Sequence, residues 1–189
     1  MENQEESKEA TDAQTAEAQA TVERLFNEAD MIVIQNMWLS AAAGFVPVPA
    51  VDAAGVTTIQ VIMLSKLAEK FEVEFSKESI KSAIAALVGG ITPVMLSTFA
   101  TSSIKAIPVI GQTIGSFTMP IIAAASTYAI GKVFLLHFAS GGTLINFDPE
   151  QFKTYYQEMF DEGKKLFRRG KEETPKEATP QQEQKAAES

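Results

Sequence analysis

The chain has 189 residues, a formal net charge of −8 and no cysteine. This length predicts one domain, and the absence of cysteine excludes disulfide bonds and zinc sites built from thiolates. Residues 1–30 contain nine acidic and two basic side chains, so they account for −7 of the −8. The rest of the chain is close to neutral and lacks the basic surface of a nucleic-acid-binding protein, so no nucleic-acid partner is expected.

The first 20 residues are rich in Glu, Gln, Ala and Thr and contain almost no large apolar side chain. Such a composition buries too little surface to offset the entropy of ordering. Residues 1–20 are therefore predicted to be a disordered acidic arm or a frayed helix. They also lack the basic start and apolar centre of a secretory signal, so any membrane insertion is expected from an internal segment.

An amphipathic helix is predicted next, because apolar residues recur at spacings of three and four. These residues are Val22, Leu25, Phe26, Ala29, Val33 and Met37. After Asp30 no charge occurs before Asp52. This uncharged stretch is open to two interpretations, a third membrane-entering segment or a buried core helix. Gln35 and Asn36 favour the core helix.

Pro47 and Pro49 predict an extended turn, since proline fixes its own φ and disfavours a helical conformation in the residue before it. Asp52 follows this turn and is predicted to cap the N-terminus of a helix over residues 53–72. The apolar stripe of that helix includes Met63, and its charged residues face water. Ser76 is predicted to cap the following helix.

The longest uncharged region spans residues 82–131 and is interrupted only by Lys105. Lys105 divides it into runs of 23 residues (82–104) and 26 residues (106–131). A membrane-spanning helix needs about 20 largely apolar residues. The two runs therefore predict a helical hairpin with its tip at Lys105 and Pro108. Their small residues would allow close packing in lipid, or would suit the centre of a soluble bundle. The length of the runs favours the membrane.

A last helix is predicted to start at Asp148, Pro149 and Glu150, an N-cap acid followed by proline and a second acid. Its end is crowded with basic residues, namely Lys164, Lys165, Arg168 and Arg169. These residues either complement the helix dipole or contact lipid or a protein partner. Residues 171–189 return to a polar composition and predict a second disordered tail.

No catalytic or metal-binding pattern is evident in the sequence. His137 is the single histidine, and no second ligand or nucleophile lies at a suitable spacing, so a core or interfacial histidine is expected. Gly131 and Lys132 do not complete a phosphate loop, which would need glycine at position 126 and Ser or Thr at position 133. Those positions hold Ser126 and Val133. We therefore expect a non-enzymatic protein without catalytic residues, cofactor or metal.

Two stretches carry a resemblance to a known family. In residues 41–78 a proline-rich turn precedes a Q-x-x-M helix, through Pro47, Pro49, Asp52, Gln60 and Met63. In residues 107–134 an I-P-x-x-G segment precedes a T-Y-x-x-G segment, through Pro108, Gly111, Thr127, Tyr128 and Gly131. Both resemble the YcjF-like, GTPase-associated family of bacterial membrane domains of unknown function, over roughly residues 23–147.

The resemblance implies a helical, membrane-associated domain that occurs alone or joined to a small GTPase domain. This chain has no GTPase domain, so nucleotide-driven activity would have to come from a partner. The family offers no established catalytic residues to transfer to this chain.

We therefore predict an all-α helical bundle over residues 21–170, with a central, membrane-inserted apolar hairpin between disordered termini. The expected function is an anchor or effector for a separate GTPase at the bacterial cytoplasmic (inner) membrane, with both termini in the cytoplasm. Membrane lipids and a second copy of the chain are further expected partners. The alternatives are a soluble helical protein-interaction domain in the cytoplasm and a self-assembling pore or membrane-remodelling protein.

Overall fold

The computed structural model describes residues 2–44, 49–101 and 111–173, and within them the side chains of residues 14–44, 55–89 and 119–172. These described residues form five helices and no strand, which confirms the all-α prediction. The helices are α1 (Glu2–Ala43), α2 (Pro49–Lys70), α3 (Lys77–Thr101), α4 (Gly111–Ala139) and α5 (Lys153–Glu173).

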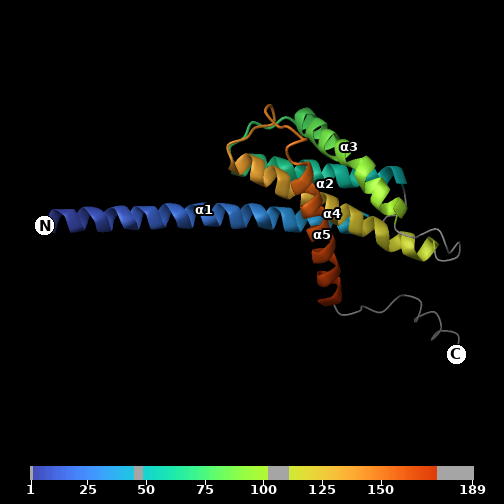
Figure 1. Ribbon diagram of the computed structural model, residues 1–189, viewed down its shortest axis with the longest axis horizontal. Helices are drawn as coiled ribbons and strands as arrows, with labels where there is room; N and C mark the ends of the chain where they lie inside the picture. The colour runs from blue at the N-terminus through green and yellow to red at the C-terminus, as the bar shows by residue number, and fades with distance from the viewer. Residues whose placement is uncertain (1, 45–48, 102–110, 174–189) are drawn as a thin grey trace.

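The central helix of the bundle is α4. Helices α1 and α5 pack most extensively against it, and α2 covers a further part (Figure 1). The second half of α4 buries both alanines and large apolar residues, among them Ala124, Ala129, Ile130, Val133 and Phe134. Burial of each large side chain contributes about 1.5–3 kcal/mol, so this helix is the main source of the core.

Glycine allows α4 to approach its neighbours closely. A Cβ atom at Gly131 would lie 2.6 Å from a methyl carbon of Val33 on α1 and 3.1 Å from the sulfur of Met63 on α2. On the other side, a Cβ atom at Gly163 of α5 would lie 3.0 Å from the Cα atom of Ala125. The helices therefore touch at positions that have no room for a side chain.

The uncharged parts of four helices lie at one end of the bundle. In Figure 1 the end of α1, the start of α2, the end of α3 and the start of α4 all point to the same side. Gly44, directly after α1, contacts the backbone of Pro120 in α4. Residues 31–43, 53–65, 82–101 and 111–131 of these helices carry no charge. We call this end of the bundle, formed by those residues, the uncharged pole.

The first half of α1 extends away from the other helices, in the direction opposite to the uncharged pole (Figure 1). Its side chains from residue 14 to residue 24 are all exposed. Residues 2–20 belong to α1, which is closer to the frayed helix than to the disordered arm among the two alternatives predicted from the sequence. The tail was predicted from residue 171, but α5 continues to Glu173, and residues 174–189 lie outside the described part of the chain.

Two helix starts differ from the sequence prediction. α2 begins at Pro49, so Asp52 lies inside the first turns of α2 instead of capping a helix that starts at residue 53. Proline suits this position because its missing N–H would have no partner in the first turn. α5 begins at Lys153; the Asp148 carboxylate accepts a hydrogen bond from Glu150 N at 3.1 Å, and residues 149–152 form turns that precede the helix.

The cap predicted at Ser76 is confirmed, since its hydroxyl accepts a hydrogen bond from the backbone N–H of Ser79 at 3.3 Å.

The two uncharged runs form α3 and α4, but the predicted tip with Lys105 and Pro108 lies outside the described residues. Where its side chains are described, α3 packs on α2 and α5, and α4 packs on α1, α2 and α5. Within these parts the two helices do not pack extensively on each other. Pro120 lies inside α4, which continues through it.

Candidate functional site

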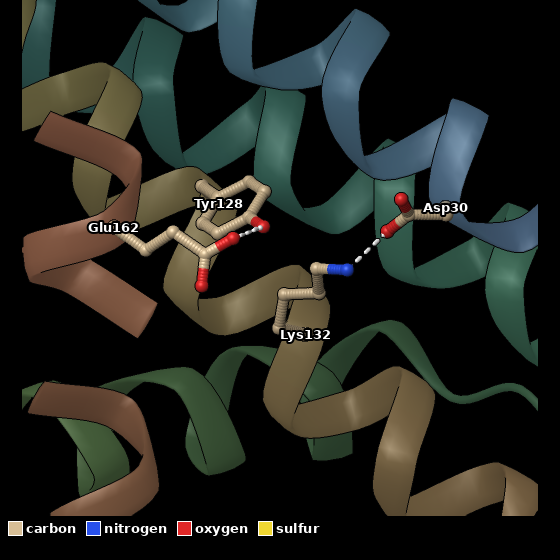
Figure 2. A network of polar contacts seen from close by, with 4 residues as sticks. All are labelled: Asp30, Tyr128, Lys132 and Glu162. Atoms are coloured by element: carbon tan, nitrogen blue, oxygen red, sulfur yellow. Dashed lines mark hydrogen bonds and ion pairs between the residues drawn. The ribbon is translucent and has the colours of Figure 1, made fainter. Parts of the chain in front are cut away.

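The charges nearest to the uncharged pole pair across helices. Asp30 is the last charge before the uncharged part of α1, and Lys132 is the first after that of α4. The Lys132 Nζ atom lies 2.5 Å from Asp30 Oδ1 and 5.4 Å from the centre of the Tyr128 ring (Figure 2). Because α1 and α4 run in opposite directions, this pair shows that both helices change from charged to uncharged at the same level.

The charges of α2 and α3 that follow or precede their uncharged parts, 53–65 and 82–101, lie at a matching position. Lys70 of α2 pairs with Glu28 of α1, and its hydrogen bond holds the pKa of the Glu28 carboxyl below its ordinary value. Lys66 of α2 and Lys81 of α3 line one shared groove. An exposed pair such as Lys70 and Glu28 adds little stability. We call these six residues the charge boundary: Glu28, Asp30, Lys66, Lys70, Lys81 and Lys132.

Helix α5 crosses α4 on the pole side of this boundary, at residues 125–128. The Tyr128 hydroxyl donates to Glu162 Oε1 at 2.8 Å (Figure 2), and the Tyr156 hydroxyl lies 3.2 Å from Ser126 Oγ. Burial raises the pKa of Tyr156 to about 12, so its hydroxyl stays protonated at physiological pH. Figure 1 shows α5 lying crosswise to α1 and α4. Polar contacts thus fix α5 against α4 at one level.

The basic end of α5 is only partly free for contacts. Lys164 pairs with Asp161 at 2.5 Å and lies over the Phe160 ring. The other basic residues predicted to contact lipid or a partner are exposed, namely Lys165, Arg168 and Arg169. The sequence analysis treated the four residues as one cluster, whereas the structure separates Lys164 from the other three.

An aromatic residue of the uncharged pole lies beside this basic end. The rings of Trp38 on α1 and Phe167 on α5 are 5.3 Å apart, and a Cβ atom at Gly170 would lie 2.5 Å from the Trp38 ring. Trp38 is itself 38% exposed. A partly exposed tryptophan is typical of a membrane–water interface.

A chain of hydrogen bonds crosses the interior of the uncharged pole. The Thr127 hydroxyl of α4 donates to Ser40 Oγ of α1 at 2.8 Å and accepts a hydrogen bond from Gln60 Nε2 of α2 at 3.2 Å. Ser40 and Thr127 are completely buried and Gln60 is 4% exposed. Buried polar groups are costly unless paired, so these bonds select one mutual arrangement of three helices.

The two stretches that carry the family resemblance meet at this point. Gln60 of the first stretch bonds to Thr127 of the second, and Met63 of the first contacts Gly131 of the second. Residues 67 positions apart therefore form one unit. The pattern links the helices of the bundle, and its described side chains are buried.

The remaining members of the pattern are only partly described. Pro49 is the first residue of α2, and Gly111 is the first residue of α4. The side chain of Asp52 is outside the described set, as are Pro47 and Pro108 altogether. Tyr128 is buried in the core and bonds to Glu162.

His137 is buried, in agreement with the core role expected from the sequence. Its Nε2 atom lies 2.9 Å from the carbonyl oxygen of Thr143, and its ring packs edge-on against Phe147 and Phe152. It therefore fastens the segment after α4 to the helix. In the described residues there is no group of three His, Cys, Asp or Glu side chains that could hold a metal ion.

Sequence reasoning missed the pairing partners in this region. It did not single out Ser40, Asp30 or Glu162, although Asp30 and Lys132 are visible as the charges that flank uncharged runs. The spacing of Asn36 and Ser40, four residues apart in an uncharged helix, was a further signal of an inward polar face.

One described segment, Met119–Ala139, is long and apolar enough to cross a membrane by length and composition, and most of it is buried inside the bundle.

The family model for DUF697, a domain of unknown function, matches residues 9–165. A relative from Magnetospirillum gryphiswaldense, named magnetosome membrane protein 22, is 37% identical over 139 residues, which is 73% of this chain and 71% of the relative. No solved structure matches the chain.

Proposed function

We propose, since the chain belongs to the DUF697 family, that it is a membrane-associated, non-enzymatic helical protein that embeds its uncharged pole in the bacterial inner membrane. The observation that carries this proposal is the shared level at which four helices change from charged to uncharged. In a water-soluble bundle nothing requires the outer charges of separate helices to stop at one level. The name of the Magnetospirillum relative, a membrane protein, supports the same placement.

The position of α5 sets the depth of insertion. α5 crosses α4 at Ala125 and keeps exposed charges such as Lys165 and Arg168, which belong in water or among lipid headgroups. From Gly111 to Ala125, α4 rises about 21 Å, which is less than the roughly 30 Å of a bilayer's hydrocarbon core. We therefore favour insertion from one side, with α5 lying along the membrane surface as interfacial amphipathic helices do.

Beyond membrane association, we propose a role as an anchor or effector for a separate GTPase, which rests on the resemblance to the YcjF-like family. The orientation supports it, because the exposed acidic half of α1 extends away from the pole, where a cytoplasmic protein could reach it (Figure 1). Both termini are then cytoplasmic.

Membrane placement can be tested by cysteine labelling. We expect the wild-type chain to stay in the membrane pellet after an alkaline carbonate wash. A membrane-impermeant maleimide should label Gln4→Cys only from the cytoplasmic side. It should label Lys105→Cys from neither side until detergent is added, because one-sided insertion keeps the hairpin tip in lipid. Labelling of Lys105→Cys from the outer side would show a full crossing. Labelling from the cytoplasmic side, or release by carbonate, would overturn the membrane proposal.

The GTPase role requires a separate experiment. The purified chain should not hydrolyse GTP, and in mild detergent it should retain a GTPase from the same cell. Reversing Lys165, Arg168 and Arg169 to glutamate tests whether α5 is the binding face: retention should weaken if it is, and binding to anionic lipid should weaken if these charges lie among headgroups. Recovery of no GTPase by the wild-type chain would contradict the partner role and leave the membrane role intact.

A further inference from the structure

A groove of about 510 Å³ lies between α2 and the start of α3. Its apolar lining includes Val61, Ile62 and Phe75, of which Ile62 is 47% exposed and Phe75 is 43% exposed. An exposed isoleucine and an exposed phenylalanine in one hollow form an apolar surface that the described chain leaves uncovered. Such a surface is unusual unless another molecule occupies it.

The charged residues that line this groove are all lysines, namely Lys66, Lys77 and Lys81. All three side chains are exposed, and none belongs to an ion pair within the described residues. Elsewhere in the described chain lysines do find acids, as Lys70, Lys132, Lys153 and Lys164 show. Three uncompensated cations around an apolar hollow favour a ligand with a negative group and an apolar chain.

The groove also has a direction relative to the uncharged pole. Lys66 is the first charge after the uncharged part of α2, and Lys81 is the last charge before that of α3. Ile62 lies one helical turn from Lys66 toward the pole, since residues four apart share a helix face. A bound amphiphile would therefore place its anionic group among the lysines and its apolar chain toward the membrane.

We propose that this groove binds the headgroup and upper acyl chain of an anionic phospholipid. Lys66, Lys77 and Lys81 contact the phosphate, and Ile62, on the pole side of the lysines, contacts the chain. This proposal rests on the membrane placement proposed above and adds a lipid preference to it. The principal competing ligand is the acidic arm of a second copy, which matches the charge but has few large apolar side chains to fill the groove.

The test uses the full chain in detergent micelles, so that it does not depend on membrane insertion. Trp38→Phe removes the single native tryptophan, and Ile62→Trp places a fluorophore in the groove. Quenching is then measured with spin-labelled phosphatidylglycerol and with spin-labelled phosphatidylcholine. We expect the anionic lipid to bind about tenfold more tightly, because basic residues near a lipid surface contribute roughly 1 kcal/mol each before screening.

The decisive variant combines Lys66→Gln, Lys77→Gln and Lys81→Gln and should bring the two affinities close to equality. The matched control combines Lys8→Gln, Arg24→Gln and Lys153→Gln, which removes the same charge from α1 and from the start of α5, away from the groove, and should leave the tenfold preference unchanged. Circular dichroism of both variants establishes that they remain helical.

Three results would overturn the lipid site. They are equal affinities in the wild-type groove, an equal loss of preference in both triple variants, and a groove variant that changes the oligomeric state without changing lipid binding. The last result would assign the groove to a second copy. If carbonate releases the wild-type chain but the preference persists, the membrane placement fails and the lipid site stands.

Discussion

Gly131→Leu is expected to lower the free energy of unfolding by about 3 kcal/mol or more, the upper range for forcing a side chain into a filled core. The first added carbon would already lie 2.6 Å from a Val33 methyl carbon and 3.1 Å from the Met63 sulfur. Both neighbours are completely buried, so neither can move into solvent. Relief requires α1 or α2 to shift away from α4, which would also stretch the hydrogen bonds at Thr127.

The effect can be measured as the change in the denaturation midpoint in mild detergent. Gly89→Ala is the matched control, because Gly89 also lies inside a helix but is exposed with nothing within 4 Å of an added Cβ atom. Gly89→Ala should raise the free energy of unfolding by up to about 1 kcal/mol, the difference in helix propensity between glycine and alanine. Equal stability of Gly131→Leu and the wild type would mean that α1, α2 and α4 are not packed as described.

Much of the architecture could be predicted from residue types and their spacing. Apolar residues three and four apart predicted the helical class, and Ser76 marked the start of α3. Boundaries were less predictable where two signals competed. Asp52 and Asp148 both have the chemistry of an N-cap, but Pro49 already begins α2 and the Asp148 turn closes before α5 begins.

The hairpin shows why local composition does not determine packing. Residues 82–131 contain enough apolar length for two adjacent membrane helices. The described part of α4 instead buries its apolar surface under α1, α2 and α5. A long uncharged run has the same appearance in lipid and in a protein core, and only its contacts distinguish the two. Here α5 covers α4 at Ala125 and exposes charged side chains such as Lys165, which places this part of α4 in the protein core.

The polar unit at the centre was beyond single-sequence reasoning for a different reason. Gln60 and Thr127 each fit the family pattern, yet nothing local indicates that their side chains meet 67 positions apart. Asp30 and Lys132 are separated by 102 positions. Such pairs depend on helix order and register, which are properties of the assembled bundle.

The hydrogen bonds of Thr127 lead to the second large expected effect. Thr127→Val keeps the shape of the side chain but removes the hydroxyl that accepts from Gln60 and donates to Ser40. Each of those buried groups then loses this partner, at about 1–3 kcal/mol for a group left unsatisfied. We expect a total loss of roughly 2–4 kcal/mol in the free energy of unfolding, although valine itself is the more apolar residue.

Thr127→Ser is the matched control, since it keeps the hydroxyl and removes only a methyl group, at a cost of roughly 1 kcal/mol. The double variant Gln60→Met with Thr127→Val supplies the coupling, because removing both polar partners abolishes the unpaired amide of Gln60. The free energy of unfolding that the double variant loses should be smaller than the sum of the losses of Gln60→Met and Thr127→Val by at least about 1 kcal/mol. If Thr127→Val were as stable as Thr127→Ser, or if the two single losses simply added, the bonds would not hold the three helices together. The family pattern would then reflect packing at Met63 and Gly131 alone.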